Sequence, residues 1–424
     1  MDRHIIESFY RRYPYPQVDR VDWDDHIHEH LRYLARACRP SRPQGPLRML
    51  IAGCGTREAV LWGASMPWAE IDAVDLSESS LEISKVLIDQ LGVSNVRLIK
   101  GDFERGEGLS GPYDFISSFG VLHHLECPEE GLRQLEAHLA PDGLMALMLY
   151  SDMNRGPLQR AQKIINKLCS DPDPDRYSER AVDLVKTGAQ VTNRLAHVFQ
   201  MGVHDYEQNR PHFADTLLNP REVSYTIPSL VQFLKTAGLG IVAPVKPVAW
   251  DPEHILPRQA YQRWCALPLL ERLEISDSLL GTLFWVLVRR EDEISEARPC
   301  QVDASLFWEM VPQPMSTGAW PVQNLVVGEP ISFAPVLNRL GGEIVSICRD
   351  PKHMLNFHQI AWRMVKGFDG RRTLREIAAQ AAREEGTELE MVEDTLKMYL
   401  TRLIDHMAIG TPDTTQCHRC PLNR

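Results

Sequence analysis

The stretch that decides the fold is residues 47–56, LRMLIAGCGT, which is followed at 71–75 by IDAVD. Its first six residues are mostly apolar, as in a buried parallel strand. Gly53 and Gly55 stand where the chain must turn sharply and bring bare backbone against a ligand. The second stretch ends in Asp75, and an acid at the tip of the second strand can accept both hydroxyl protons of a ribose. Together they predict a βαβ unit that binds a nucleoside.

The glycine turn differs from that of dinucleotide-binding folds. Those folds use G-x-G-x-x-G to rest a pyrophosphate on a helix N-terminus, whereas Gly55 is followed here by Thr56, Arg57 and Glu58. A pyrophosphate would be poorly held. A Gly-x-Gly pair on its own also occurs in plain strand-to-helix turns, so the sequence further along the chain must decide between a ligand site and a simple turn.

Three more strand-like stretches follow in regular order, at 96–103, 113–125 and 139–150. This order resembles that of class I S-adenosylmethionine-dependent methyltransferases, and the match covers residues 48–155 well. The resemblance implies an α/β fold with a Rossmann-like, seven-stranded sheet. It also implies that S-adenosylmethionine is the cofactor.

The resemblance further implies a role for each strand end. The glycine turn holds the methionine end of the cofactor, the acid after the second strand holds the ribose, the pair after the third strand holds the adenine, and the segment after the fourth strand forms the floor. No metal site is expected. The implied cofactor-binding residues are Gly53, Cys54, Gly55, Asp75, Leu76, Asp102, Phe103, Phe119, Gly120 and His123.

The sequence departs from the family pattern at three places. Ile51 stands where the family often has an acid, and Arg57 stands where it often has a third glycine. These departures keep a non-catalytic cofactor sensor among the alternatives. Residues 118–120, SFG, replace the Asn-Pro-Pro-Tyr type of motif found in enzymes that methylate planar amides and bases. This replacement argues against methylation of adenine or glutamine.

Composition restricts the class of protein. The chain has 424 residues and a formal net charge of −11, so strong nonspecific binding to nucleic acid, which needs clustered Lys and Arg, is not expected. It contains no run of about 18 apolar residues and no signal-peptide pattern, so we expect a cytoplasmic protein without membrane association. Nine cysteines without framework spacing predict free thiols.

The segment before the first strand is dense in aromatics and prolines, reading ESFYRRYPYP at 7–16. We expect residues 1–45 to form an N-terminal arm. One hypothesis makes the arm a lid that folds over the cofactor, excludes water and presents ring faces to the sulfonium. The other makes it an anchor that packs the arm on the domain. Similar Tyr-Pro-Tyr-Pro leaders precede the first strand in several bacterial methyltransferases of this general type, which favours the lid.

After Tyr150 the alternation of strands and helices stops. Residues 151–219 predict a helical insertion, and residues 227–239 predict a helix with a glycine stop. The sheet then resumes at 240–248. In the family, a late apolar strand such as 281–290 inserts antiparallel beside the fifth, so we place the methyltransferase domain at residues 46–291.

The insertion lies where class I enzymes usually build the acceptor pocket, above the carboxyl ends of the strands. The sequence does not identify the catalytic residue, because each polar side chain taken alone is more often structural. The candidates are His123, Tyr150, Arg155 and Tyr225, with His124, His204, Tyr206, His212 and Asp215 as further polar residues that could orient or deprotonate an acceptor.

Beyond the first domain, a proline-rich linker at 292–320 precedes a second, smaller domain at 321–410. It is predicted to hold short strands and three helices. The strands are expected at 324–327 and 343–347 and the helices at 357–366, 373–383 and 389–405. Thr373 and Glu376 form a capping-box pattern at the start of the second of these helices.

Residues 365–378, VKGFDGRRTLREIA, resemble the helix-turn-helix centre of small winged-helix domains. Such domains serve as peptide-binding (PqqD-like) chaperone domains of the pyrroloquinoline-quinone peptide family and as C-terminal domains of bacterial protein-lysine methyltransferases. The resemblance implies recognition of a peptide or protein, with dimerisation or structural support as the alternative. Residues 331–424 hold 13 basic and 12 acidic residues, which argues against DNA binding.

A mobile tail is expected at 411–424, where Cys417 and Cys420 could instead supply two metal ligands or a redox pair. Three functions stay open. The first is a methyltransferase that acts on a nitrogen or oxygen of a protein or peptide. The second is a small-molecule methyltransferase whose C-terminal domain forms a homodimer. The third is the cofactor sensor.

Overall fold

A computed structural model of the chain describes residues 3–16, 46–67, 69–245, 250, 252, 255–281, 284–294, 313–314, 372–393 and 409–410. The chain divides into two compact units. The first takes in residues 1–23, 44–244 and 273–291, and the second takes in 24–43, 245–272 and 292–424. The site described below lies within the first unit.

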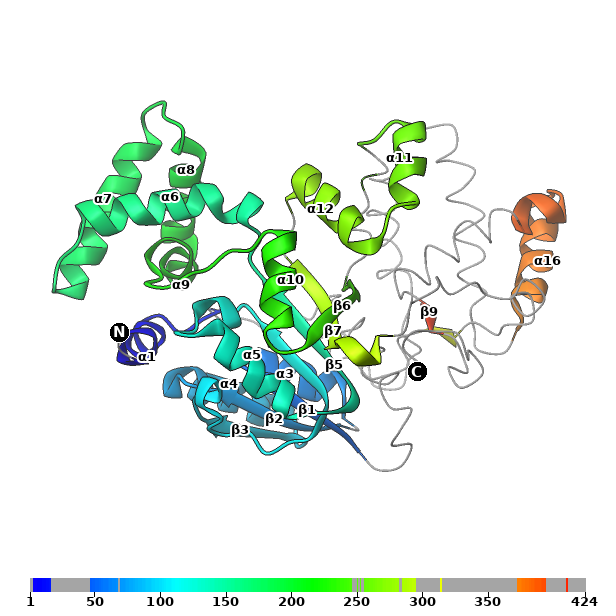
Figure 1. Ribbon diagram of the computed structural model, residues 1–424, viewed down its shortest axis with the longest axis horizontal. Helices are drawn as coiled ribbons and strands as arrows, with labels where there is room; N and C mark the ends of the chain where they lie inside the picture. The colour runs from blue at the N-terminus through cyan, green and yellow to red at the C-terminus, as the bar shows by residue number, and fades with distance from the viewer. Residues whose placement is uncertain are drawn as a thin grey trace. The chain divides into compact units, whose positions relative to one another are not determined.

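A mixed seven-stranded sheet forms the centre of the first unit (Figure 1). Its strands lie in the order β3-β2-β1-β4-β5-β7-β6, with β7 antiparallel to both β5 and β6. The α/β fold with a seven-stranded sheet is therefore confirmed, including the antiparallel strand beside the fifth. The strands are β1 (Leu47–Ala52), β2 (Ala69–Asp75), β3 (Val96–Lys100), β4 (Tyr113–Phe119), β5 (Leu139–Leu149), β6 (Leu239–Pro244) and β7 (Phe284–Arg290).

Helices between the strands carry local signals that explain where they begin and end. The connecting helices are α3 (Glu58–Ser65), α4 (Glu78–Leu91), α5 (Pro128–Ala137) and α10 (Ile227–Lys235). Helix α4 begins at Ser77, whose hydroxyl accepts a hydrogen bond from the Ser80 amide, and ends at the left-handed Gly92. Helix α10 begins with a capping box at Thr226, and Gly238 follows with a positive φ. The predicted glycine stop is confirmed.

A group of helices follows β5 and forms the predicted insertion (Figure 1). These are α6 (Asp152–Leu168), α7 (Pro174–Ala189), α8 (Ala196–Gln208), α9 (Arg210–Phe213) and a π-helical turn, η3 (Ala214–Leu218). Their apolar faces form a core of their own around Ile165, Val185, Phe199 and Leu217. The insertion is thus a packed helical layer that holds its polar residues in fixed places.

Helix α1 (Arg3–Arg12) is the described part of the N-terminal arm, together with residues 13–16. Phe9 on this helix and Tyr13 just after it pack against the core of the insertion. Helix α1 also lies against α4. The arm therefore joins the insertion to the sheet-bearing part of the unit.

The second unit contains α11 (Arg258–Cys265), part of α12 (Leu269–Leu280), the paired strands β8 (Gln313–Pro314) and β9 (Ile409–Gly410), and α16 (Leu374–Glu385). The capping box at Thr373 and Glu376 is confirmed. The predicted strands at 324–327 and 343–347, the helix at 357–366, most of the helix at 389–405 and the Cys417–Cys420 pair lie outside the described residues. Among those that are described, no helix combines the length and apolar character needed to cross a bilayer.

Candidate active site

Four parallel strands bring the predicted cofactor residues to one edge of the sheet. β1, β2, β3 and β4 run parallel to their neighbours, so their carboxyl ends lie at the same side. Gly53 follows β1, Asp75 ends β2, Asp102 follows β3 and Phe119 ends β4. In open α/β sheets this edge is where ligands bind.

The turn after β1 requires its two glycines. Gly53 has φ +76° and Gly55 has φ +54°, a region in which a side chain is strained. A Cβ on Gly53 would lie 2.4 Å from a methyl group of Val121, which follows β4. The amides of Gly53 and Cys54 donate to the carbonyl oxygen of Val74 at 2.8 and 3.1 Å, while the Cys54 side chain is fully buried. Bare backbone thus faces the end of β4.

Asp75 ties the end of β2 to this turn. Its Oδ2 accepts from the Gly55 amide and its Oδ1 from the Ser77 amide, both at 2.8 Å. Burial raises the pKa of Asp75, and the backbone hydrogen bonds oppose that rise. The carboxylate is therefore held in a fixed position at the mouth of the site, with Leu76 next to it and only partly buried.

The residues at the ends of β3 and β4 form the next part of the candidate site. Asp102 is 9% exposed and precedes the short helix η1 (Phe103–Arg105), whose Phe103 is 4% exposed. Phe119 packs its ring against Trp285 with centroids 4.9 Å apart. Gly120 has φ +72° and its amide donates to Met148 at 3.1 Å.

The residues present suit S-adenosylmethionine. The positive φ values of Gly53 and Gly55, with Val121 and the Tyr15 carbonyl packed against them, leave no room for side chains at this turn, so a ligand there would meet bare backbone. A fixed carboxylate at Asp75 suits a ribose diol, and the aromatic ring of Phe103 beside Asp102 suits an adenine. The donor set therefore fits a nucleoside with an amino-acid tail better than a pyrophosphate.

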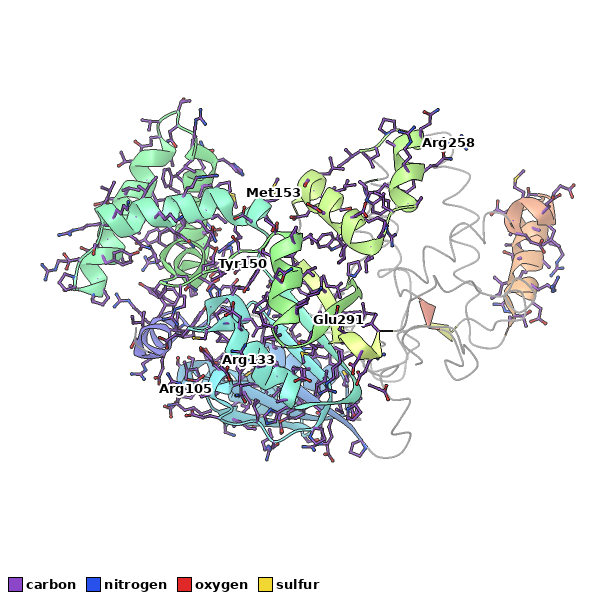
Figure 2. The ribbon with its side chains drawn as sticks, viewed as in Figure 1. Arg105, Arg133, Tyr150, Met153, Arg258 and Glu291 are labelled. Carbon is purple, nitrogen blue, oxygen red and sulfur yellow. The ribbon has the colours of Figure 1, made fainter. Side chains whose placement is uncertain are left out.

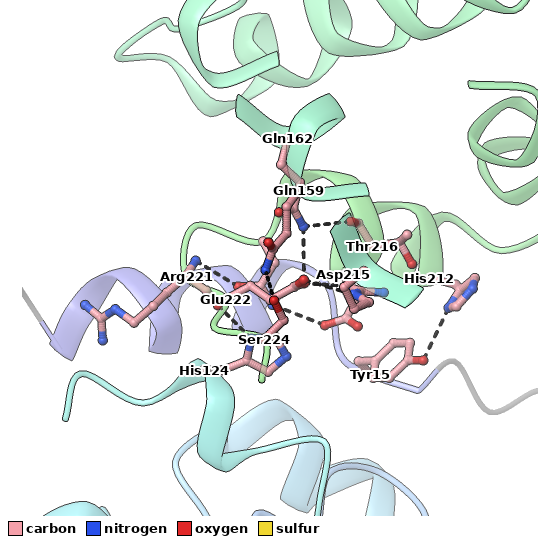
Figure 3. A network of polar contacts seen from close by, with 12 residues as sticks. Tyr15, His124, Gln159, Gln162, His212, Asp215, Thr216, Arg221, Glu222 and Ser224 are labelled. Carbon is pink, nitrogen blue, oxygen red and sulfur yellow. Dashed lines mark hydrogen bonds and ion pairs between the residues drawn. The ribbon is translucent and has the colours of Figure 1, made fainter. Parts of the chain in front are cut away.

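The N-terminal arm contacts both this turn and the insertion. The Thr56 hydroxyl donates to the Pro16 carbonyl at 2.6 Å, and a Cβ on Gly55 would lie 2.8 Å from the Tyr15 carbonyl oxygen. On the insertion side, the Tyr15 hydroxyl lies 3.2 Å from Nδ1 of His212, over which its ring is stacked (Figure 3). The arm thus lies between the glycine turn and the insertion.

His123 is the most unusual candidate among the described residues. It lies in the short helix η2 (Leu122–His124), is fully buried, and neither of its ring nitrogens has a hydrogen-bond partner there. Its ring packs against that of Tyr150, with centroids 3.8 Å apart and the ring planes tilted by 32°. Burial and the neighbouring His124 and Arg155 hold the pKa of His123 well below its usual value. The neutral form of the imidazole is therefore favoured, and its two buried nitrogens make no hydrogen bond within the described part of the chain.

Tyr150 lies where β5 leads into the insertion (Figure 2). The Arg155 guanidinium stands 3.9 Å from the centre of the Tyr150 ring and forms a two-pronged ion pair with Glu222, with Nε to Oε1 at 2.9 Å. Burial raises the pKa of Tyr150, and the charge of Asp215 adds to that rise. The phenol therefore stays protonated at neutral pH.

The segment at 219–225 fixes the ends of β4 and β5 together (Figure 3). The Val223 amide donates to the His123 carbonyl at 2.9 Å and the Tyr225 amide donates to the Tyr150 carbonyl at 2.8 Å. A nitrogen of the His124 ring lies 2.6 Å from the Arg221 carbonyl oxygen. His124 is therefore occupied in holding this segment.

The other sequence candidates lie in different surroundings. His204 is exposed on α8, and Tyr206 packs against Phe213 inside the insertion. Tyr225 packs against Phe233 of α10 with centroids 5.0 Å apart. By contrast, the structure brings His123, Tyr150, Arg155, His212 and Asp215 to one region. Sequence reasoning missed Glu222 and Asn219 as polar partners there and gave Tyr10 no role beyond that of an arm aromatic.

A cavity of about 400 Å³ occurs at the opposite edge of the sheet. It is lined by the amino-terminal parts of β2, β3 and β4, and its floor carries an ion pair between Arg97 and Asp72 at 2.8 Å. Arg97, Tyr113 and Ser110 all donate to the Asp72 carboxylate. The Asp72 carboxylate therefore has its hydrogen-bond partners within the protein. Because the cavity lies at the other edge of the sheet, it is distinct from the candidate active site.

Replacing Asp75 by alanine is expected to weaken binding of S-adenosylmethionine by about 2 kcal/mol, because a charged hydrogen-bond acceptor for the ribose is lost. Calorimetry measures this. Because Asp75 also holds the Gly55 amide, a cofactor analogue lacking the ribose hydroxyls is the control. The wild type should lose affinity for that analogue, whereas the variant should bind both forms alike. A variant that still discriminates between them would exclude the ribose role.

Comparisons with known proteins agree with this geometry. Residues 50–145 match a family model described as a methyltransferase domain. An uncharacterized protein of Synechococcus is 26% identical over 293 residues, which cover 63% of this chain and 68% of that protein. A malonyl-[acyl-carrier protein] O-methyltransferase of Halalkalibacterium halodurans is 37% identical over 107 residues, which are 24% of this chain and 38% of that enzyme.

Among solved structures, PKMT2 from Rickettsia typhi matches with a TM-score of 0.60 and 15% identity, covering 92% of this chain and 76% of PKMT2. The same protein in complex with AdoHcy gives the same values. The sheet order and the matched domain agree with a methyltransferase, which favours the catalytic alternatives over the cofactor sensor. The chain carries a class I methyltransferase domain and is an S-adenosylmethionine-dependent methyltransferase.

Proposed function

We propose that this enzyme methylates a side chain of a protein or peptide. The observation that carries the proposal is the extent of the similarity to PKMT2, a bacterial protein-lysine methyltransferase, which covers 92% of this chain and so reaches well beyond the matched domain at 50–145. The winged-helix resemblance of residues 365–378 supports the same substrate class, since such domains bind peptides. Lysine is the first acceptor to test.

Within this proposal each strand end has a task. The backbone at Gly53 and Gly55 receives the methionine end of the cofactor, Asp75 receives the ribose, and Asp102 with Phe103 receives the adenine. Phe119 and Gly120 form the floor, and His123 completes it. The fixed carboxylate at Asp75 and the positive φ values of the two glycines support these assignments.

The chain's contribution to the chemistry is mainly positioning. When bound, S-adenosylmethionine supplies a methyl group on a positively charged sulfur, which an aligned lone pair can take up directly. The ordered wall of Tyr150, Arg155 and Glu222 fixes the acceptor side, and alignment of the reacting atoms is worth several kcal/mol. Neutral His123 offers a ring nitrogen to orient the acceptor without adding charge.

The N-terminal arm closes the site in this proposal. Its contacts with Thr56 and His212 bridge the cofactor turn and the insertion. Deleting residues 1–16 is therefore expected to lower turnover at least about tenfold, because water would enter and the acceptor wall would lose its support. Single-turnover kinetics with the full-length chain as reference measures this. Arg11→Ala, an exposed change on the same helix, is the control and should leave turnover intact. Normal turnover after the deletion would reduce the arm to an anchor.

Methylation of a small molecule is the second candidate. The similarity to the Halalkalibacterium enzyme favours a small acyl group with an oxygen acceptor, because that enzyme is named as an O-methyltransferase of malonyl-[acyl-carrier protein]. In this case the C-terminal region would serve dimerisation. The two candidates make opposite predictions for a chain truncated after residue 320.

The deciding experiment incubates the full-length protein with methyl-labelled S-adenosylmethionine and extract from the native host, then separates macromolecules from small molecules. Label in protein supports the proposal, and mass spectrometry then identifies the modified residue. Label only in the small-molecule fraction supports the second candidate. The truncation after residue 320 should lose protein labelling while its cofactor affinity, measured by calorimetry, stays unchanged. Full protein labelling by the truncated chain would show that the C-terminal region does not select the substrate.

A further inference from the structure

Asp215 is a buried carboxylate without a cationic partner among the described residues. It lies on the π-helical turn η3, which connects the insertion to the 219–225 segment, and is 4% exposed. Its Oδ1 accepts from the Tyr10 hydroxyl at 2.9 Å and from the Asn219 side-chain amide at 3.3 Å. Within the described part of the chain, Oδ2 accepts no hydrogen bond and no ion pair includes Asp215. π-Helical turns occur frequently at functional sites.

A buried charge without a counter-charge is costly, and proteins usually pair such a group or use it for a ligand. Arg155 is near enough for its guanidinium to feel the field of Asp215. However, the guanidinium forms its two-pronged contact with Glu222, whose side chain is 2% exposed. Arg155 thus forms its direct ion pair with Glu222, and none of the ion pairs among the described residues joins Arg155 to Asp215.

Three phenols lie near enough to Asp215 for its carboxylate to affect them electrostatically. The Tyr10 hydroxyl binds Asp215 directly. Burial raises the pKa of Tyr15 to about 12 and that of Tyr10 well above its usual value, and the charge of Asp215 contributes to both shifts and to that of Tyr150. One face of Tyr150 packs against His123, whose ring nitrogens have no partner in the described part of the chain. A carboxylate among aromatic rings is an arrangement that receives organic cations.

We propose that Asp215, with Tyr10 and Tyr15 as aromatic walls, forms the subsite that receives the positive charge of an amine acceptor. This inference rests on the proposed methyl transfer and adds to it that the acceptor atom is an aliphatic amine nitrogen. Two of the walls come from the N-terminal arm, so the subsite is complete only when the arm is in place. Asp215 would act as a specificity-determining residue.

The charge balance of the reaction agrees with this assignment. The acceptor arrives as an ammonium ion and gives one proton to water, which frees the nitrogen lone pair. The lone pair then forms the new N–C bond while the C–S bond breaks and its electron pair stays on sulfur, so the positive charge moves from sulfur to nitrogen. A fixed carboxylate beside the nitrogen stabilises that developing charge. A hydroxyl or carboxylate acceptor would gain nothing from it.

The test measures binding of two small probes to the full-length protein by ligand-observed NMR. n-Butylamine is a cation at neutral pH, like the lysine side chain, and 1-butanol has a similar size without the charge. Wild type is expected to bind n-butylamine at least about tenfold more tightly, as a charge-assisted hydrogen bond provides. Asp215→Asn keeps the shape and the contact with Tyr10 but should bind both probes alike. Asp183→Asn, which removes an exposed carboxylate from α7, is the matched control and should keep the preference.

Tyr10→Phe separates charge recognition from simple support of Asp215. It removes the hydrogen bond but leaves the carboxylate, so the preference for n-butylamine should persist in a weakened form. A preference for the amine that survives Asp215→Asn, or equal binding of both probes by wild type, would overturn the proposal.

A second arm keeps this inference distinct from the proposed function. Host proteins are acetylated at their amines before labelling, and protein label should then disappear. Label that survives acetylation overturns the amine subsite but leaves a protein substrate standing. If untreated host proteins take up no label but the protein clearly prefers n-butylamine, the proposed protein substrate is overturned. The amine subsite is then supported, with an amine of another kind as the acceptor.

Discussion

Replacing Arg155 by alanine is expected to lower the free energy of unfolding by about 3–5 kcal/mol, because it leaves the Glu222 carboxylate buried without its partner. The side chains of this pair are 9% and 2% exposed. Gln162 also donates to Glu222, at 3.2 Å, but an amide cannot balance the charge. Urea unfolding of the full-length protein measures the effect.

Two further variants show that the loss comes from the unpaired charge. Lys85→Ala breaks the exposed pair with Asp89, in which the side chains are 69% and 65% exposed, and should cost at most about 0.5 kcal/mol. Replacing Arg155 and Glu222 together by methionine removes both charges and should recover most of the stability. If the double variant is no more stable than Arg155→Ala, the pair does not act as a unit.

The same change is expected to affect catalysis, because Arg155 also covers the Tyr150 ring at 3.9 Å. Stability and activity can be separated with the double methionine variant, which restores the fold but not the cation. Low activity in that variant with normal cofactor affinity would place Arg155 in the acceptor wall. Such a residue acts by positioning Tyr150.

The residues that we propose for the cofactor follow local patterns in the sequence. Apolar runs followed by glycine or aspartate mark the strand ends, so the turn at Gly53 and the carboxylate at Asp75 could be predicted within a residue. The capping box at Thr373 could be predicted for the same reason, since its partner Glu376 is three residues away. Features whose partners are close in sequence leave a readable pattern.

The acceptor side leaves no such pattern. Arg155 and Glu222 are 67 positions apart, and Tyr10 and Asp215 are 205 positions apart. Each pair forms only because the insertion packs as a layer and the N-terminal arm lies against it. Sequence could suggest Arg155 and Asp215 as polar candidates in the insertion, but not which partner each one has. The unpaired state of Asp215 became visible only with the fold.

The second prediction with a large expected effect concerns the glycine turn after β1. Gly53→Ala is expected to lower the free energy of unfolding by about 3 kcal/mol, with left-handed strain and a steric clash each contributing about 1–2 kcal/mol. The clash is with Val121, whose nearest methyl carbon would lie 2.4 Å from the new Cβ. Because the clash pushes β1 and β4 apart at the cofactor edge, affinity for S-adenosylmethionine should fall by at least about tenfold, measured by calorimetry.

Gly92→Ala is the matched control for this prediction. Gly92 has nearly the same backbone angle, with φ +65°, but nothing lies within 4 Å of its Cβ position, so the change should cost only the strain of about 1 kcal/mol and leave cofactor affinity unchanged. Adding Val121→Ala to Gly53→Ala should then return the share of stability lost to the clash. Equal losses for Gly53→Ala and Gly92→Ala would mean that backbone strain alone selects glycine at the turn. A larger loss that Val121→Ala relieves would mean that the close approach of Val121, just after β4, selects glycine at the turn.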